Sequence, residues 1–296
     1  MEKVQTNLKK EWQTYKRILI ITGLLHPNEA LNDVLNDISK QNNVAILTET
    51  TSNVFGEYFN RSIDRLVVGI EGSESDYIPD LLVTLGGPVV SKKVKAFLRK
   101  NKPKAHWHIN ASNDSVDTYQ SLTRIIPLSP EKILKFFVGF DVKSNFRDKW
   151  LRKDSELQSI YDEFVTEIEF CDLKVFEVVL NHIPTGSRVQ LANSTVVRYS
   201  NLFNQPSQNK LLCFSNRGTS GIDGTISTAV GAAIASNKLT TVITGDLSFF
   251  YDSNALWITP FPQSLKIIMI NNKGGNIFRI IDGPSKTDEL EPFLEA

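Results

Sequence analysis

The sequence predicts an α/β fold of two Rossmann-like units, each a parallel β-sheet flanked by helices. Short apolar runs, typical of strands buried on both faces, alternate with amphipathic helical stretches along the chain. At 296 residues, the chain is long for a single hydrophobic core, which indicates two domains. A charged, helix-permissive segment at 141–163 interrupts the alternation. We therefore expect one domain at 1–150 and a second at 151–296.

The elements of the first unit follow from the position of its apolar residues. A strand is expected at 17–23, and an amphipathic helix at 28–41, where apolar side chains recur at helical spacing. A basic helix is expected at 91–100. Because strands and helices alternate, the sheet should be parallel with right-handed crossovers. The remaining strands of this unit are predicted at 44–47, 65–68, 81–85 and 105–109.

The second unit shows the same alternation. Residues 176–180 predict a helix, and residues 224–235, rich in Gly and Ala, predict a helix that packs closely on the sheet or on a neighbouring subunit. The last residues, 288–296, show no closing element, so this unit is expected to be truncated at its C-terminus. Its strands are predicted at 188–191, 211–215, 240–244 and 265–270.

The composition is that of an ordinary soluble protein, with 41% hydrophobic and 22% charged residues. Lys+Arg and Asp+Glu are equal at 33 each, so no global basic field would recruit nucleic acid. Cys171 and Cys213 are too few for a disulfide framework. The first residues lack the apolar core of a signal peptide, and no apolar run approaches the roughly 18 residues of a membrane span. We expect a cytoplasmic protein without nucleic-acid or membrane partners.

Two polar segments follow neighbouring predicted strands near the C-terminus. Residues 244–252 read Thr-Gly-Asp-Leu-Ser-Phe-Phe-Tyr-Asp, and Asn272 comes 26 residues after Asp246, within Ile-Asn-Asn-Lys-Gly-Gly. Parallel strands would deliver both side chains to the sheet edge where open α/β sheets bind ligands. A carboxylate, an amide oxygen and a backbone carbonyl suit Mg²⁺, which shares its octahedron with phosphate and water. Taken separately, Gly-Asp can be only a turn with a helix N-cap, and Asn-Asn is common in loops.

The paired segments resemble the motif of the thiamine-diphosphate-dependent enzymes, Gly-Asp-x followed some 25–30 residues later by Asn-Asn. The resemblance implies thiamine diphosphate and Mg²⁺ or Mn²⁺ as cofactors, with Asp246, Asn272 and the Gly274 carbonyl as metal ligands. It also implies that the Gly-Asp turn opens a helix facing the diphosphate. Leu247 departs from the commonest form of the motif, which has Gly there. The implied cofactor-binding residues are Ile222, Gly245, Asp246, Leu247, Ser248, Asn272, Gly274, Gly275 and Ile277.

A narrower resemblance comes from the amino-acid sequences of three segments, 215–224, 245–256 and 271–278. These segments are similar to the 2-succinyl-5-enolpyruvyl-6-hydroxy-3-cyclohexene-1-carboxylate synthases of menaquinone biosynthesis, strongly from residue 190 onward and weakly before it. That family implies decarboxylation of 2-oxoglutarate, addition to isochorismate, and a homodimer or homotetramer. Two alternatives stay open: another thiamine-diphosphate carboligase, such as an acetolactate-synthase-like enzyme, and a non-catalytic module that kept the fold.

Both implied substrates carry carboxylates, for which arginine forks are suited. Each candidate has an alternative role: surface pairing for the arginines, a solvated helix start for the lysines, and core packing for Ile222, Ile277 and Phe278. The substrate-binding positions implied by the resemblance are Ser194, Arg198, Arg217, Phe278, Lys92 and Lys93.

The resemblance also implies what this chain lacks. In the family, a pyrimidine-binding domain comes first and supplies an activating glutamate, usually to the partner subunit's site. We expect that domain to be missing, so that the chain is a fragment with no catalytic residue of its own and no turnover alone. No Gly-x-Gly-x-x-Gly follows a strand in the first unit, which argues against a dinucleotide site. His106, His108 and His182 show no metal spacing and are expected to be structural.

Overall fold

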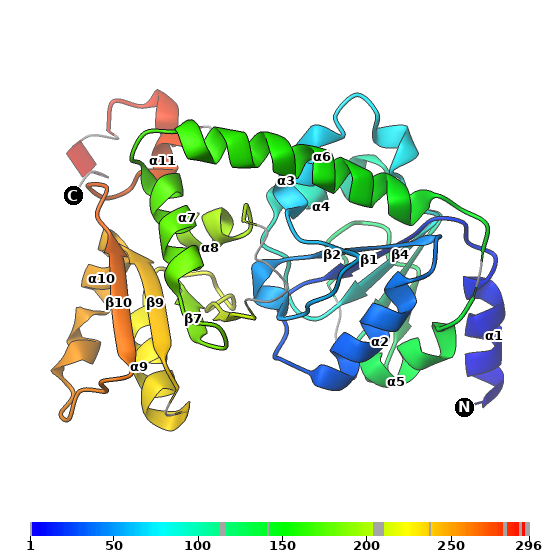
Figure 1. Ribbon diagram of the computed structural model, residues 1–296, viewed down its shortest axis with the longest axis horizontal. Coiled ribbons are helices and arrows are strands. Elements are labelled where there is room, and N and C mark those ends of the chain that lie inside the picture. The colour runs from blue at the N-terminus through cyan, green and yellow to red at the C-terminus, as the bar shows by residue number, and fades with distance from the viewer. Residues whose placement is uncertain are drawn as a thin grey trace. The chain divides into compact units, whose positions relative to one another are not determined.

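A computed structural model of the chain describes residues 2–112, 116–140, 142–203, 210–236, 238–280, 283–289 and 292–293. It forms two compact α/β units, as predicted (Figure 1). The first unit comprises Met1–Glu167 and Asn201–Ser207, and the second comprises Ile168–Ser200 and Gln208–Ala296. The two units are divided after Glu167, whereas the sequence suggested a boundary at residue 150. Residue 150 lies inside α6 (Phe146–Glu167), which is one continuous helix.

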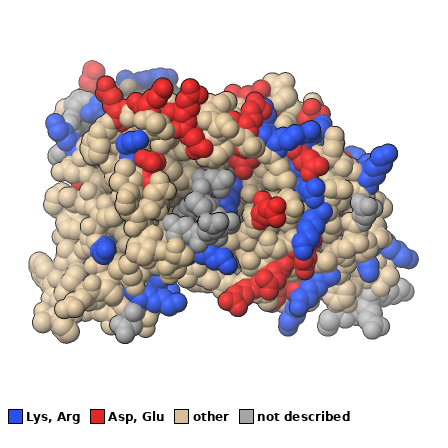
Figure 2. Space-filling view, in the orientation of Figure 1, with Lys and Arg blue, Asp and Glu red and all other residues tan. Residues whose placement is uncertain are grey.

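The surface carries charges of both signs. Lys and Arg lie interspersed with Asp and Glu on the face shown in Figure 2, and some of them pair, as in the 2.8 Å contact between Lys149 Nζ and Asp76 Oδ1. Within the described ranges, no helix combines the length and apolar character needed to cross a membrane.

The first unit is built on a six-stranded sheet in the order β3-β2-β1-β4-β5-β6. All its neighbouring strands are parallel. The chain adds strands on one side of β1 and then returns to add them on the other, so β1 and β4 flank the switch point of a doubly wound sheet. The strands are β1 (Ile18–Thr22), β2 (Val44–Thr48), β3 (Phe59–Asn60), β4 (Leu81–Leu85), β5 (Ala105–Ile109) and β6 (Arg124–Ile126).

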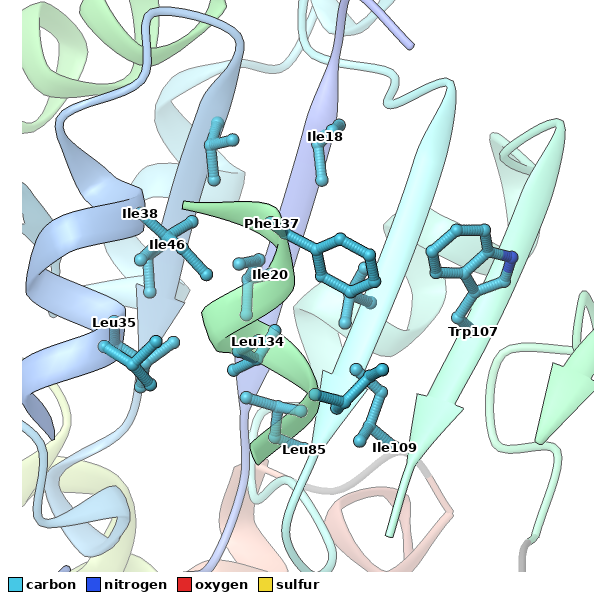
Figure 3. Packing of buried hydrophobic residues seen from close by; sticks show 14 of the residues in the cluster. Ile18, Ile20, Leu35, Ile38, Ile46, Leu85, Trp107, Ile109, Leu134 and Phe137 are labelled. Atoms are coloured by element: carbon cyan, nitrogen blue, oxygen red, sulfur yellow. The ribbon is translucent and has the colours of Figure 1, made fainter. Parts of the chain in front are cut away.

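Helices cover both faces of this sheet, which gives the unit two hydrophobic cores. Alternate residues of a strand point to opposite faces; Ile18 and Ile20 therefore join one core, and Leu19 and Ile21 join the other. In the first core, Phe137 lies over the strands (Figure 3). The first face is covered by α1 (Glu2–Trp12), α2 (Glu29–Ser39), α5 (Pro130–Leu134) and the 3₁₀ turn η3 (Lys135–Phe137), and the second by α3 (Ile63–Gly69), α4 (Lys92–Lys100) and α6.

The strand predicted at 65–68 is wrong, because these residues lie within α3. The two valines of this run favour a strand by propensity. However, Ile63, Leu66, Val67 and Ile70 are buried together in one core, and their spacing of three, four and seven residues is that of a helix face. Tertiary packing therefore decides against local propensity here. The short strands β3 and β6 were not predicted, since two or three residues carry no readable alternation.

The second unit is built on a four-stranded parallel sheet in the order β10-β9-β7-β8. On α9, Ala229 and Ala233 are buried against Val242, so the small residues do allow close packing on the sheet, as predicted. The prediction for residues 288–296 falls largely outside the described residues. The elements are β7 (Arg188–Leu191), β8 (Leu212–Phe214), β9 (Thr240–Gly245), β10 (Leu265–Ile270), α7 (Asp172–His182), α8 (Thr195–Ser200), α9 (Thr225–Ser236), α10 (Asp246–Tyr251), α11 (Ile277–Ile280), and the 3₁₀ turns η4 (Ser253–Trp257) and η5 (Pro284–Lys286).

Candidate metal and cofactor site

The two polar segments near the C-terminus meet at one edge of the second sheet. Strands β9 and β10 are parallel neighbours, and their register sets Gly245 opposite Ile270. Both strands therefore end at the same level. Asp246 begins α10 directly after β9, and Asn272 follows two residues after β10. The sheet thus brings the predicted aspartate and asparagine together.

The carboxylate of Asp246 organises the turn after β10. Its Oδ2 accepts hydrogen bonds from the backbone N–H of Gly274 at 2.8 Å and of Asn272 at 3.2 Å, while Oδ1 accepts from Leu247 N at 2.7 Å. Lys273 and Gly274 have φ of 65° and 85°, and this left-handed turn aims two N–H groups at one oxygen.

Asp246 is only 5% exposed. None of the ion pairs found within the described ranges includes Asp246. Three N–H dipoles face its negative charge, with no Lys or Arg partner in the part of the chain that the structure describes, and a buried carboxylate without a cationic partner is costly. A bound cation would complete this arrangement.

Asn272 is held by groups on both sides. Its Nδ2 donates to Asp172 Oδ2 at 2.6 Å, and its carbonyl accepts from Asn276 Nδ2 at 2.5 Å. The Gly274 carbonyl accepts from Asn276 N, also at 2.5 Å, which leaves one of its two lone pairs. Across the described residues, no cluster of three His, Cys, Asp or Glu side chains is placed to hold a metal. The donors here are of another kind: a carboxylate, an amide oxygen and a carbonyl.

A cleft of about 130 Å³ opens at this edge. Two residues of its wall are joined by a hydrogen bond, which the Ser248 hydroxyl donates to the Ile222 carbonyl. All nine predicted cofactor-binding residues line the cleft, and two of the predicted substrate-binding residues, Ser194 and Phe278, line it with them. The full lining is Asn193, Ser194, Thr195, Val196, Ile222, Gly245, Asp246, Leu247, Ser248, Asn272, Gly274, Gly275, Asn276, Ile277 and Phe278.

The two predicted arginines lie next to residues of this lining but do not belong to it. Arg217 Nη1 donates to Asn193 Oδ1 at 2.7 Å. Arg198 Nη1 lies 3.4 Å from the carbonyl of Ser194, whose own φ is 70°. Both guanidinium groups are therefore anchored beside the segment that follows β7.

Lys92 and Lys93 are exposed in the first turn of α4 and belong to the first unit. They are not part of the cluster formed within the second unit.

Three residues of this region were not predicted as functional. Asn193 is buried at 2% exposure and bonds Arg217, and its place directly after β7 is a signal that could have found it. Asn216 donates to the Gly224 carbonyl at 3.1 Å and accepts from Gln190 Nε2 at 3.0 Å. Asp172 carried no signal, because it lies 100 residues from its partner Asn272.

Comparison with known proteins identifies the family. No family model matches the chain. Curated proteins named 2-succinyl-5-enolpyruvyl-6-hydroxy-3-cyclohexene-1-carboxylate synthase do match it. The one from Flavobacterium psychrophilum is 39% identical over 288 residues, and the one from Flavobacterium johnsoniae is 40% identical over 295; each alignment covers 96% of this chain and 52% of the relative. The one from Porphyromonas gingivalis is 35% identical over 305 residues, covering 100% of this chain and 52% of the relative.

The chain belongs to this synthase family. It spans about half the length of the curated relatives it matches. The similarity to the synthases includes the first unit, where the sequence resemblance was weak, since the alignments cover 96–100% of the chain.

In this member of the synthase family, the first unit holds a buried carboxyl group. Burial raises the pKa of Glu49 to about 7, although hydrogen bonds from the N–H groups of Val90 and Ser91, each at 2.7 Å, oppose the shift. His106 of β5 is also buried, whereas His108 of the same strand is half-buried. Burial lowers the pKa of His106 to about 4, and Thr84 Oγ1 lies 2.9 Å from both His106 Nε2 and His108 Nδ1.

Proposed function

We propose that the second unit binds Mg²⁺ or Mn²⁺ together with thiamine diphosphate. The observation that carries this proposal is the buried Asp246 carboxylate, which no Lys or Arg side chain pairs within the described ranges and which lies beside Asn272 and Gly274 at a sheet edge. We further propose that the chain supplies the central domain and the diphosphate-binding domain of a 2-succinyl-5-enolpyruvyl-6-hydroxy-3-cyclohexene-1-carboxylate synthase. The substrates would be 2-oxoglutarate and isochorismate.

The residues at the edge fit this cofactor by their chemistry. Asp246, the Asn272 amide oxygen and the Gly274 carbonyl are hard oxygen donors, as Mg²⁺ prefers, and a diphosphate would complete the metal's coordination. When bound, thiamine diphosphate supplies an electron sink that stabilises a carbanion. The chain's own apolar side chains Ile222 and Ile277 line the same cleft and would position the cofactor's organic part.

Arg198 and Arg217 are proposed to bind the carboxylates of the substrates. Both are half-buried beside the segment that follows β7. A guanidinium suits carboxylates because its planar fork can form two parallel hydrogen bonds, and the bond from Arg217 Nη1 to Asn193 Oδ1 fixes the direction of this fork. Ser194 and Phe278 line the cleft and would contact substrate there. A role for Lys92 and Lys93 rests on the family resemblance alone.

No glutamate is among the described residues that line the cleft. The activating glutamate of thiamine-diphosphate enzymes would therefore have to come from elsewhere, and we propose that the 296-residue chain binds cofactor without turnover. As part of a whole enzyme it would act in the cytoplasm as a homodimer or homotetramer. Membership of the synthase family favours this function over an acetolactate-synthase-like carboligase.

Calorimetric titration with Mn²⁺ and thiamine diphosphate tests the binding proposal. Asp246→Asn keeps the shape of the side chain but removes its charge, and it should weaken binding at least tenfold. The control is Asp223→Asn, at an exposed aspartate of the same unit, which should bind within about twofold of the wild type. Equal binding by all three proteins would remove the metal-site assignment.

An assay of substrate consumption tests the reaction. With thiamine diphosphate and Mn²⁺ present, 2-oxoglutarate and isochorismate should not be consumed by the chain alone. Rapid turnover of this pair would contradict the inference that the activating group comes from elsewhere. Consumption of pyruvate, with 2-oxoglutarate left unused, would instead support the acetolactate-synthase-like alternative.

A further inference from the structure

Asp172, the first residue of α7, contacts the predicted metal ligand Asn272 through a 2.6 Å hydrogen bond. We propose that Asp172 is a positioning residue that fixes the amide of Asn272 with its oxygen available to the metal. The inference rests on the proposed function, because it presumes that Asn272 binds a cation through its side chain.

The chemistry of the contact decides which atom of the amide faces Asp172. An ionised carboxylate only accepts hydrogen bonds. The amide atom beside Asp172 Oδ2 must therefore be the nitrogen, even though the nitrogen and oxygen of an amide are nearly alike in size and shape. Oδ1 is the other branch of the same planar group. Since Asn272 also lines the cleft, the contact leaves it able to present an acceptor there.

The backbone of Asn272 is fixed independently of this contact. Its N–H donates to Asp246 Oδ2 at 3.2 Å, and its carbonyl accepts from Asn276 Nδ2 at 2.5 Å. These bonds set where the residue lies but leave the amide free to rotate about its terminal torsion. Without Asp172, the amide could turn by half a revolution and present an NH₂ donor to a cation. Asp172 is the group that makes one of these two orientations favourable.

Asp172 is itself held by its place on α7. The helix is anchored to the unit by the buried side chains of Phe176 and Leu180. An acidic residue in the first turn of a helix is favoured by the helix dipole. The carboxylate is therefore directed at Asn272 from a rigid element, as expected of groups that orient a metal ligand.

Two other roles would explain a nearby carboxylate: direct coordination of the metal, or attraction of the cation by charge alone. Asp172→Asn separates them from positioning. Its amide oxygen would still accept from Asn272 Nδ2, but its charge is lost and it is a poorer ligand. Asp172→Ala removes the acceptor altogether. A matched control is Glu177→Ala on the same helix, where the carboxylate pairs with Lys174 and Asn181, outside the cleft.

The experiment is a Mn²⁺ titration followed by electron paramagnetic resonance, with thiamine diphosphate present, on the full chain and its variants. Asp172→Ala should weaken Mn²⁺ affinity by about 10- to 100-fold. Asp172→Asn should stay within about threefold of the wild type, and Glu177→Ala should be unchanged. In ¹⁵N spectra, the two NH₂ proton signals of Asn272 should be well separated in the wild type and in Asp172→Asn, and should move toward solvent-exposed values in Asp172→Ala. Circular dichroism would verify that each variant folds.

The outcomes are distinct. Unchanged Mn²⁺ affinity in Asp172→Ala, with a loss in Asp246→Asn, would overturn the positioning role and leave the proposed function standing. Equal losses in Asp172→Ala and Asp172→Asn would also overturn it, in favour of charge or direct coordination. Unchanged affinity in Asp246→Asn would overturn the proposed function itself, and this inference with it.

Discussion

Arg217 donates a hydrogen bond from Nη1 to Asn193 Oδ1 at 2.7 Å. The other end of the same amide donates from Nδ2 to the carbonyls of Asn216 at 2.7 Å and Gly221 at 2.6 Å. One buried side chain after β7 therefore links an arginine to two points of the segment between β8 and α9. That segment includes Ile222, which lines the cleft. Asn193 thus couples the stability of the second unit to the shape of the cleft wall.

Replacing Asn193 by Ala should leave these partners without their bonds. Because buried polar groups are costly when unpaired, we expect the free energy of unfolding of the second unit to fall by about 2–4 kcal/mol. Amide hydrogen exchange at 215–224 should also be faster in this variant than in the wild type, and the increase should be larger there than elsewhere in the second unit. Asn181→Ala, at an exposed asparagine of α7, is the control and should change neither quantity. Unaltered exchange at 215–224 in Asn193→Ala would contradict the role assigned to this side chain.

Glu49 should make the stability of the first unit depend on pH. Burial raises its pKa from 4.5 to about 7. Between these values the folded chain keeps a proton that the unfolded chain has lost, so stability should fall as pH rises from about 4.5 to about 7 and then level off. The loss attributable to this group is on the order of 3 kcal/mol. Glu49→Gln, which carries no titrating proton, should lack this component.

The measurement is urea unfolding between pH 4 and 8, followed by tryptophan fluorescence. Trp12, Trp107 and Trp150 are fully buried in the first unit, whereas Trp257 of the second is 85% exposed, so the signal reports mainly the first unit. The contribution of His106 to the pH dependence of stability has the opposite sign, because its lowered pKa makes stability rise from about pH 4 to 6.5. That contribution cancels in the difference between wild type and Glu49→Gln. Glu57→Gln, at an exposed position, should follow the wild type, and a flat difference curve would show that the pKa of Glu49 is not raised.

The parts of the fold that the sequence predicts are those encoded by local pattern. Apolar runs locate β9 and β10, and parallel pairing then brings Asp246 and Asn272 to one edge. Contacts made across long sequence separations leave no such pattern. The bond between Asp172 and Asn272 spans 100 residues, and nothing near either residue indicates it. The two compact units divide after Glu167 for a related reason: α6 continues to that residue with no change of composition near residue 150.

Gly23 occupies a position where no side chain fits. A Cβ built on it would lie 2.0 Å from the carbonyl oxygen of Gly87. The segments after β1 and β4 are joined there by backbone hydrogen bonds from Gly23 N to Leu85 O at 2.9 Å and from Gly87 N to Leu24 O at 2.8 Å. Because the clash is with backbone, it cannot be relieved by rotating a side chain. The glycine is therefore required by the close approach of these two segments at the switch point of the first sheet.

Gly23→Ala should lower the free energy of unfolding of the first unit by about 3 kcal/mol or more. The matched control is Gly72→Ala. Its φ is 84°, but a Cβ there meets nothing within 4 Å, so it should cost only the left-handed backbone strain of about 1–2 kcal/mol. Urea unfolding followed by tryptophan fluorescence gives both values. Equal losses would mean that the segments after β1 and β4 can separate at little cost.

Asp252 provides a cap for α9 from outside that helix. It is 6% exposed, and it accepts from Ser227 N at 2.7 Å through Oδ2 and from Ser227 Oγ at 2.5 Å through Oδ1. Ser227 is the third residue of α9, and its N–H belongs to the first turn, where backbone donors have no partner within the helix. Asp252 lies between α10 and η4, so the bond ties the start of α9 to the chain that follows the candidate site.

Asp252→Ala should therefore lower the free energy of unfolding of the second unit by about 1–3 kcal/mol, since it removes the acceptor of the part-buried Ser227 N–H. Ser227→Ala should cost less, because it removes the hydroxyl but keeps the backbone bond. The double mutant isolates their interaction: the hydroxyl bond should appear as a coupling energy of about 0.5–1.5 kcal/mol in urea unfolding followed by far-ultraviolet circular dichroism. Asp252→Asn, whose amide can accept from the N–H and donate to the hydroxyl, should retain part of the stability that Asp252→Ala loses. If the effects of Asp252→Ala and Ser227→Ala are simply additive, the carboxylate does not bond the hydroxyl in solution, and the cap reduces to the backbone contact alone.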